Sequence, residues 1–122
     1  MTQVRLSRAI EFAASLRVAR PDLDEADNRR LFGLQATQHG HNFRLEVTVR
    51  GVPDPITGMV MNLTELEDLL EREIMQRFDH RDLNQDTTFF EKDPPTAENL
   101  AALIHRLLLE ALPPGALDRI RL

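Results

Sequence analysis

The sequence predicts an α+β domain in which an antiparallel sheet of four strands is covered on one face by two helices. Three observations carry this prediction: strict alternation of apolar and polar residues over 43–51, and two apolar runs of helical period, over residues 64–78 and 96–111. Strand-like segments precede and follow the helical runs instead of alternating with them, an order typical of an antiparallel sheet with its helices on one side. At this length we expect one domain over residues 1–122 with a modest core.

Residues 3–14 alternate well enough to form the first strand. Its main apolar positions share one parity and are the candidates for the buried face: Val4, Leu6, Ile10 and Phe12. The alternation slips at residues 7–9, which predicts a β-bulge or a break there. Residues 20–28 are polar and include a proline near their start, so they predict a loop or a short irregular helix, and residues 31–38 lead back into the sheet.

Residues 43–51 form the clearest strand. Its apolar face comprises Phe43, Leu45, Val47 and Val49. The opposite face is polar, so we expect one side to pack and the other to meet water or a partner. Residues 52–58 predict a turn, and Met59–Met61 predict a short returning strand that completes a hairpin.

The first helical run, residues 64–78, has two candidate capping boxes at its start. Thr64 with Glu67 is one, and Asn62 with Glu65 is the alternative. The apolar positions of this run recur at helical spacing and form one stripe: Leu66, Leu69, Leu70, Ile74 and Phe78.

The second helical run follows Pro94 and Pro95, is capped by Thr96, and ends before Pro113. Its expected buried residues follow the same period: Leu100, Leu103, Ile104, Leu107, Leu108 and Ala111. Leu117–Leu122 then predicts a final strand.

Composition excludes several classes of function. The net charge of −5 argues against a general nucleic-acid binder, because neutralising phosphates requires a basic face. The chain has no cysteine, so it has no disulfide and no thiol nucleophile. No apolar run reaches membrane-spanning length, and residues 1–20 carry charges where a signal peptide needs an apolar segment. We therefore expect a cytoplasmic protein with no nucleic-acid or membrane partner.

Two histidines one residue apart lie where the second strand begins. Side chains alternate faces along a strand, so His39 and His41 project the same way, with only hydrogen at Gly40 between them. This geometry suits metal chelation on a rigid element. The commoner interpretation of such a pair is two polar histidines at a strand end.

Four segments carry a more specific signal, and they occur in this order: His39–Phe43, Thr57–Leu63, Phe78–Asn84 and Pro95–Leu100. In their residues and their intervals they resemble the 6-pyruvoyl-tetrahydropterin synthase and 6-carboxytetrahydropterin synthase family. The resemblance runs from about Leu6 to the C-terminal end of the chain.

That resemblance implies the T-fold, in which subunits join their sheets into an oligomeric barrel, with active sites between subunits. It implies a homo-oligomer, trimeric or hexameric, whose partner is a small-molecule pterin. In the family, triphosphate is eliminated from 7,8-dihydroneopterin triphosphate in tetrahydrobiopterin or queuosine biosynthesis. A zinc ion held by three histidines acts there as a Lewis acid, a cysteine thiolate removes a proton, an Asp-His pair moves another, and a glutamate anchors the pterin ring.

Three pairs of residues match the family's functional positions. They are the zinc ligands His39 and His41, the catalytic proton-relay pair Asp79 and His80, and the substrate-binding residues Thr96 and Glu98. The last two also have structural roles open to them, since an N-cap favours threonine and the first helical turn favours an acid. We expect the imidazole pair and the Asp-His pair to converge on one pocket.

Two positions depart from the family pattern. Leu16 stands where the first zinc histidine is expected, and Gln35 stands where the catalytic cysteine is expected. Leucine cannot ligate zinc, and glutamine cannot act as a base at neutral pH. Water or a carboxylate such as Asp22 or Asp24 would have to complete a zinc site, so we expect weaker metal binding than in the family. The interval from Gln35 to His39 resembles the 6-carboxytetrahydropterin branch.

We therefore expect a tetrahydropterin-synthase homologue that acts on 7,8-dihydroneopterin triphosphate or a related pterin, as a carbon-oxygen lyase of reduced or altered activity. The alternative is a non-catalytic pterin-binding protein, because the base and a metal ligand are missing together. A structural barrel subunit that binds no pterin is a third possibility.

Overall fold

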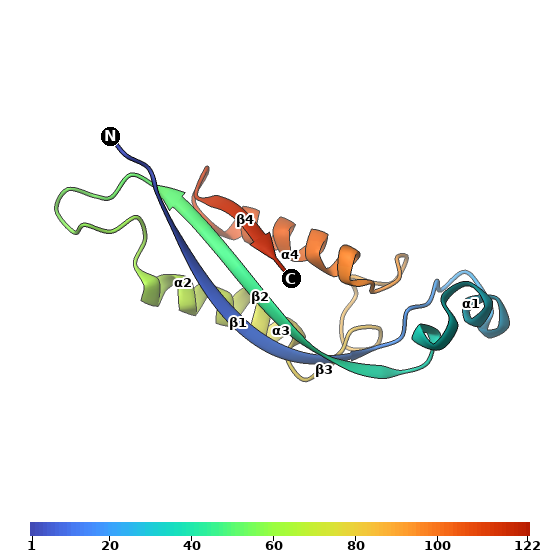
Figure 1. Ribbon diagram of the computed structural model, residues 1–122. Helices are drawn as coiled ribbons and strands as arrows, with labels where there is room; N and C mark the ends of the chain where they lie inside the picture. Colours follow the sequence, from blue (N-terminus) through green and yellow to red (C-terminus); the bar gives the residue numbers. More distant parts are fainter.

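Two long antiparallel strands, β1 (Val4–Leu16) and β2 (His39–Gly51), form the central ribbon of the computed structural model, which describes residues 1–122 (Figure 1). Their register is continuous from the pair Val4 and Gly51 to the pair Leu16 and His39. The predicted bulge at residues 7–9 is therefore wrong. Arg8 simply occupies an inward-facing position, and its guanidinium lies 2.9 Å from the carboxylate of Glu67 on the covering helix. The ion pair lets a charged residue interrupt the apolar pattern without a change of register.

The sheet has four strands in the order β3-β1-β2-β4. Strand β4 (Leu117–Arg121) is antiparallel to β2, as the sequence predicted, whereas the two-residue β3 (Arg81–Asp82) is parallel to β1. The sheet is thus mixed and not purely antiparallel. Residues 59–61 form no strand, because β2 is already paired with β1 on one side and with β4 on the other. Backbone hydrogen bonds between Asp54 and residues 58 and 59 close the turn without a returning strand.

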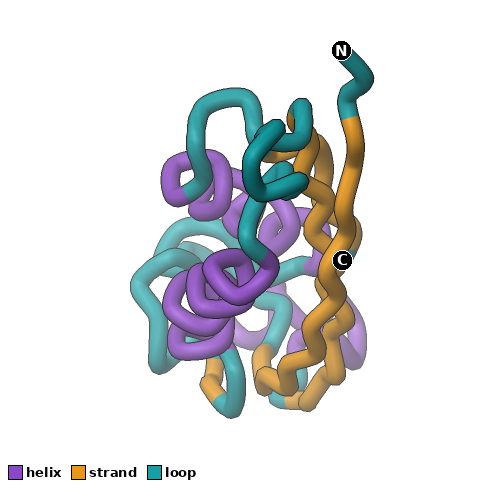
Figure 2. Tube along the Cα trace, turned by 90° about the vertical axis from the view of Figure 1, so that its left-hand side faces the viewer, coloured by secondary structure: helices purple, strands orange, loops and turns teal.

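The helices cover one face of the sheet (Figure 2). The first helical run is α2 (Leu63–Leu70), a π-helical turn η2 (Glu71–Met75) and the short α3 (Gln76–Phe78). Asn62 caps it by accepting a hydrogen bond from the Thr64 backbone N–H at 2.9 Å, so of the two candidate caps the one that begins at Asn62 is confirmed and the one that begins at Thr64 is wrong. Helix α4 (Ala97–Ala111) begins at the predicted N-cap Thr96, whose hydroxyl accepts from the Asn99 N–H at 3.1 Å.

No helix of the chain has both the length and the apolar composition needed to cross a membrane.

The core lies between the sheet and these helices. The predicted apolar faces supply it: Phe12 from β1, Leu45, Val47 and Val49 from β2, Leu66, Leu70, Ile74 and Phe78 from the first helical run, and Leu100, Ile104 and Leu108 from α4. Each fully buried large side chain contributes about 1.5–3 kcal/mol to folding. Val4 is exposed, and Leu6 and Ile10 are only half-buried, whereas their register partners on β2, Val49 and Leu45, are fully buried. The helices therefore cover β2 more completely than the first half of β1.

The segment between the two long strands is more ordered than the sequence predicted. Helix α1 (Glu25–Phe32) begins at Asp24, whose carboxylate accepts a hydrogen bond from the Asp27 N–H at 2.7 Å. A 3-10 turn, η1 (Gly33–Ala36), follows it and leads into β2. This segment stands beyond the end of the sheet (Figure 1) and forms one wall of the cavity described next.

Candidate functional site

His39 and His41 project to the same side of β2, as the alternation predicted. Their rings meet edge to face with centroids 4.7 Å apart, and the His41 ring lies 5.5 Å from the ring of Phe43. His39 Nδ1 is 2.6 Å from the carbonyl oxygen of Thr37. A carbonyl can only accept, so Nδ1 is the donor in this contact, and in the neutral ring Nε2 is the nitrogen with the free lone pair.

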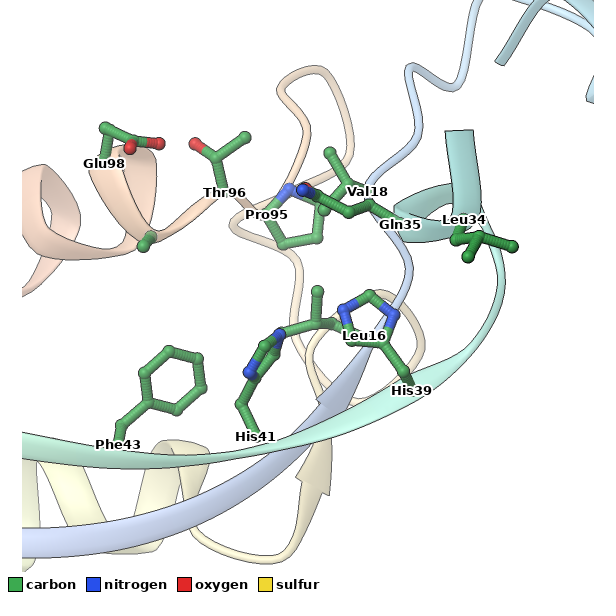
Figure 3. A pocket seen from close by; sticks show the side chains of 11 residues that line it. Leu16, Val18, Leu34, Gln35, His39, His41, Phe43, Pro95, Thr96 and Glu98 are labelled. Carbon is green, nitrogen blue, oxygen red and sulfur yellow. The ribbon is translucent and has the colours of Figure 1, made fainter. Parts of the chain in front are cut away.

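The two imidazoles line a cavity of about 570 Å³, called here the imidazole cavity (Figure 3). Three parts of the chain form its wall: Leu16, Val18, His39, His41 and Phe43 from the two long strands and the residues that follow β1, Leu34 and Gln35 from η1, and Pro95, Thr96, Ala97 and Glu98 from the start of α4. Thr96 and Glu98 stand across the space from the histidines. The volume is within the range of small-molecule sites.

Charge is sparse around the imidazole cavity. Glu98 is the one carboxylate in the lining, and no lysine or arginine lines it. The floor formed by Leu16, Val18 and Phe43 is apolar, which suits the flat face of a heterocycle. Cations that pair with a phosphate chain would have to come from other residues or from another copy of the chain.

Two asparagines that the sequence analysis did not single out hold the wall after β1. The Asn84 side chain accepts from the Arg17 N–H at 2.9 Å and donates to the Arg17 carbonyl at 3.0 Å. Asn28 does the same for Arg20, at 2.8 and 3.1 Å, and is nearly buried. Between them, the Val18 N–H donates to the Gln35 carbonyl at 2.7 Å. The amides replace a neighbouring strand, and no local sequence pattern marks Asn28 for this role.

The residues of the imidazole cavity do not fit a zinc site with three protein ligands. Leu16 is the register partner of His39 and is only 2% exposed, so a hydrocarbon side chain occupies the place where the family resemblance expects the third imidazole. No group of three or more His, Asp or Glu side chains is arranged to hold a metal ion.

The carboxylates considered from the sequence are engaged elsewhere. Asp22 forms an ion pair with Arg20 at 2.7 Å, which holds the Asp22 pKa below its usual value, and Asp24 caps α1. Neither therefore completes a metal site with the imidazole pair.

Asp79 and His80 form the contact that the sequence predicted, with Asp79 Oδ2 3.0 Å from His80 Nδ1. The other oxygen of Asp79 accepts from the Ala13 N–H at 3.0 Å, and the His80 N–H donates to the Ala13 carbonyl at 2.6 Å. The hydrogen bond from the Ala13 N–H has the largest effect and lowers the Asp79 pKa below its usual value. Burial opposes it, and the smaller effects of the neighbouring His80 lower the pKa further. His80 has φ 59°, a left-handed conformation that is uncommon outside glycine.

In the single chain the imidazole cavity includes His39 and His41 but neither Asp79 nor His80, so the two complete pairs do not meet in that cavity at this level. His41 and His80 nevertheless both line a smaller space of about 370 Å³. Asp79 and His80 line a second space of about 500 Å³, called here the outer cavity. Its other residues are mainly outward-facing positions of β1 and β2: Glu11, Ala13, Asn42 and Arg44, with Phe12 and Phe43 beneath. The sequence motifs contained no information on which face of the sheet the loop after α3 would reach.

The architecture and the cavity together define an α+β protein with a small-molecule site at the end of its long strands. A sequence profile of the family described as 6-pyruvoyl tetrahydropterin synthase matches residues 5–122. The chain belongs to this family, and tetrahydropterin synthase is the function that membership supports.

Tetrahydropterin synthases of several organisms are similar in sequence or structure to nearly the whole of this chain. The 6-pyruvoyl tetrahydrobiopterin synthase of Homo sapiens is 41% identical over 121 residues, which are 98% of this chain and 83% of that protein. The protein of the same name from Pongo abelii is 42% identical over 122 residues, which are 98% of this chain and 84% of that one. The solved structure of Caenorhabditis elegans 6-pyruvoyl tetrahydropterin synthase has a TM-score of 0.90 at 32% identity and covers 98% of this chain and 87% of that one. This likeness confirms the predicted T-fold for the single subunit.

Proposed function

We propose that this chain binds 7,8-dihydroneopterin triphosphate or a related pterin in the imidazole cavity and that its lyase activity is reduced or altered. One observation carries the proposal: strand, turn and helix bring His39, His41, Thr96 and Glu98 around a single space with an apolar floor. Family membership supplies the class of ligand.

Glu98 is proposed to anchor the ring. A pterin presents a guanidine-like edge of N–H donors, and a carboxylate accepts such donors in paired, charge-assisted hydrogen bonds. Glu98 is the one carboxylate in the lining and is exposed, so it is free to do so. The Thr96 hydroxyl already caps α4 as an acceptor, which leaves its proton available to the ligand.

The proton relay is proposed to act from a neighbouring copy. Asp79 is held ionised and orients Nδ1–H of His80, so Nε2 of that ring faces outward as a proton acceptor. In one chain this pair opens away from the imidazole cavity, and the family resemblance implies sites between subunits. A partner's Asp-His pair would therefore complete the cavity of this chain.

Open strand edges support a homo-oligomer, which is part of the proposal. The two-residue β3 pairs only with Ala14 and Ser15, which leaves the edge of β1 before them without a strand partner. Such an edge readily adds strands of another copy. Light scattering on the purified chain tests this, and a monomer at micromolar concentration would contradict it.

The reduced activity follows from two side chains. Triphosphate elimination requires removal of a C–H proton, and the Gln35 amide at the cysteine position cannot accept it. Loss of a positioned base costs about 10²- to 10⁴-fold in rate. The second candidate function is a non-catalytic pterin-binding protein. It is favoured by the presence of Leu16 and Gln35 together, because a protein that lacks both a zinc ligand and the catalytic base has little means of carrying out the reaction.

The test uses two measurements on the same preparation. Fluorescence titration with 7,8-dihydroneopterin triphosphate measures binding, and chromatography measures released triphosphate and identifies the pterin product. We expect binding in the micromolar range typical of small metabolites, with slow release. Binding without release supports the second candidate, and no binding to any dihydropterin contradicts both. The pterin product also shows whether the chain acts as a 6-pyruvoyl- or a 6-carboxytetrahydropterin synthase. The interval before His39 resembles the carboxy branch, whereas the similar proteins are named for the pyruvoyl product.

A further inference from the structure

We propose that the imidazole cavity recognises its pterin without a metal ion, that His39 contacts the ligand directly through Nε2, and that Leu16 is the residue responsible for this. The inference rests on the proposed pterin binding and specifies how the same site achieves it. Its basis is the donor set of the cavity and the way the two long strands are paired.

The strand pairing leaves no route to a third protein ligand from β1, and no group of three His, Asp or Glu side chains is arranged to hold a metal ion. Catalytic zinc sites use three protein ligands and keep a fourth position open. The ladder between β1 and β2 is unbroken up to the pair Leu16 and His39, so no bulge brings another β1 side chain to that place. Ser15 and Arg17, on either side of Leu16, have the opposite parity and face away from the imidazoles.

Leu16 is also fixed in its position. It is 2% exposed and belongs to the main hydrophobic cluster, so it cannot swing aside to admit a metal-bound water without opening the core. Its hydrocarbon surface instead continues the floor that Val18 and Phe43 form. A flat heterocycle gains from packing on such a floor, whereas a hydrated metal ion does not.

Without a metal, the histidines are free to bond the ligand themselves. The Thr37 carbonyl holds the proton of His39 on Nδ1, so Nε2 is a hydrogen-bond acceptor in a fixed orientation. Gln35 lines the same cavity, and its backbone is held by Val18. An amide both donates and accepts, which complements the mixed donors and acceptors of a pterin edge.

The first experiment titrates wild-type protein with 7,8-dihydroneopterin in EDTA and in excess zinc. We expect dissociation constants that agree within about twofold, because no metal takes part. His39→Ala should weaken binding about fivefold in both buffers, the value of one hydrogen bond. Loss of binding in EDTA, or an unchanged affinity in His39→Ala, would overturn the proposal.

The second experiment measures zinc binding alone by calorimetry, so it tests whether Leu16 keeps the cavity from binding a metal ion even if no pterin binds and the proposed function fails. Leu16→His places an imidazole beside both histidines, and Leu16→Met is the matched control that keeps an apolar side chain. Removing a residue that only hydrogen-bonds to a metal ligand lowers metal affinity about 10- to 100-fold. A new residue that binds zinc directly should therefore tighten zinc binding by at least about 100-fold, in Leu16→His and not in Leu16→Met.

If Leu16→His does not fold, zinc binding to the wild-type protein and to a His41→Ala variant still tests the proposal. We expect its weak zinc affinity to change less than about threefold in the His41→Ala variant, since two imidazoles alone do not make a zinc site. Stoichiometric zinc in wild-type protein after dialysis, lost in His41→Ala, would show that the cavity is a metal site after all.

Discussion

The imidazole cavity and the Asp79–His80 pair differ in how tightly the fold constrains their residues. Leu16 and Gln35 stand at family positions of the imidazole cavity where the fold accepts other residue types: one is a core apolar residue, and the other is held through its backbone carbonyl. Asp79, by contrast, accepts the Ala13 N–H and so has a structural duty of its own. The presence of Asp79 is therefore weaker support for catalysis than its motif suggests.

His80 is the more informative member of the pair. Its φ of 59° is a conformation that glycine or asparagine adopts at lower cost, and its side chain is 83% exposed, so neither packing nor backbone conformation calls for histidine. A chemical role explains the residue better than a structural one. The comparison thus gives Asp79 a structural role and leaves His80 as the residue of the pair whose proposed chemical role is the more open to test.

The largest effect is expected at Asn28, which supports the wall of the imidazole cavity. Asn28→Ala leaves the Arg20 N–H and the Leu23 carbonyl without partners and removes one of the two donors to the Arg20 carbonyl, so we expect about 3 kcal/mol lower free energy of unfolding in urea. Asn28→Asp keeps the acceptor and should lose less. Equal losses in the two variants would show that the Arg20 N–H bond contributes nothing.

The Asp79 carboxylate should matter to stability even without substrate. Asp79→Ala removes the acceptor of the Ala13 N–H and should cost about 1–2 kcal/mol in the same urea measurement. Asp79→Asn retains an oxygen acceptor and is the matched control. A fully stable Asp79→Ala protein would return the residue to a purely catalytic role.

His80 should behave in the opposite way. In His80→Gly, relief of the left-handed backbone and the greater chain entropy of glycine roughly cancel, so stability should stay within about 1 kcal/mol of wild type. Triphosphate release should nevertheless fall to background. His80→Val, which enters this conformation poorly, should be the less stable variant, and similar stability of the two would contradict the strain at this residue.

The smallest effect is the pH dependence contributed by Asp79. Because folding lowers its pKa, the unfolded chain binds the proton more readily, and the carboxylate stabilises the protein fully above the usual aspartate pKa of about 4. This contribution is lost as the pH falls through the lowered folded value. The stability difference between wild type and Asp79→Asn should therefore be constant near neutrality and shrink below about pH 4. A difference that persists in acid would assign it to something other than charge.

Local pattern was sufficient for most of the secondary structure and for part of the candidate site. Alternation identified the strand that contains Leu45 and Val47, helical period identified the helix that contains Leu100 and Ile104, and i, i+2 spacing placed His39 and His41 on one face. These succeed because backbone geometry alone sets which side chains share a face. The strand at Met59–Met61 failed because pairing depends on which edge of β2 is free, and β4 lies much later in the chain.

By itself, the amino-acid sequence determined the residue types available to the site: two imidazoles, one aspartate-histidine couple, no thiol, and a leucine in place of a third nitrogen donor. Only the tertiary structure decided that Leu16 faces His39 across the ladder, that Asn28 and Asn84 hold the wall, and that Asp79 and His80 lie outside the cavity lined by both imidazoles. The reason is physical. Residue chemistry and side-chain alternation are local properties, whereas the meeting of segments tens of residues apart depends on how the whole chain packs.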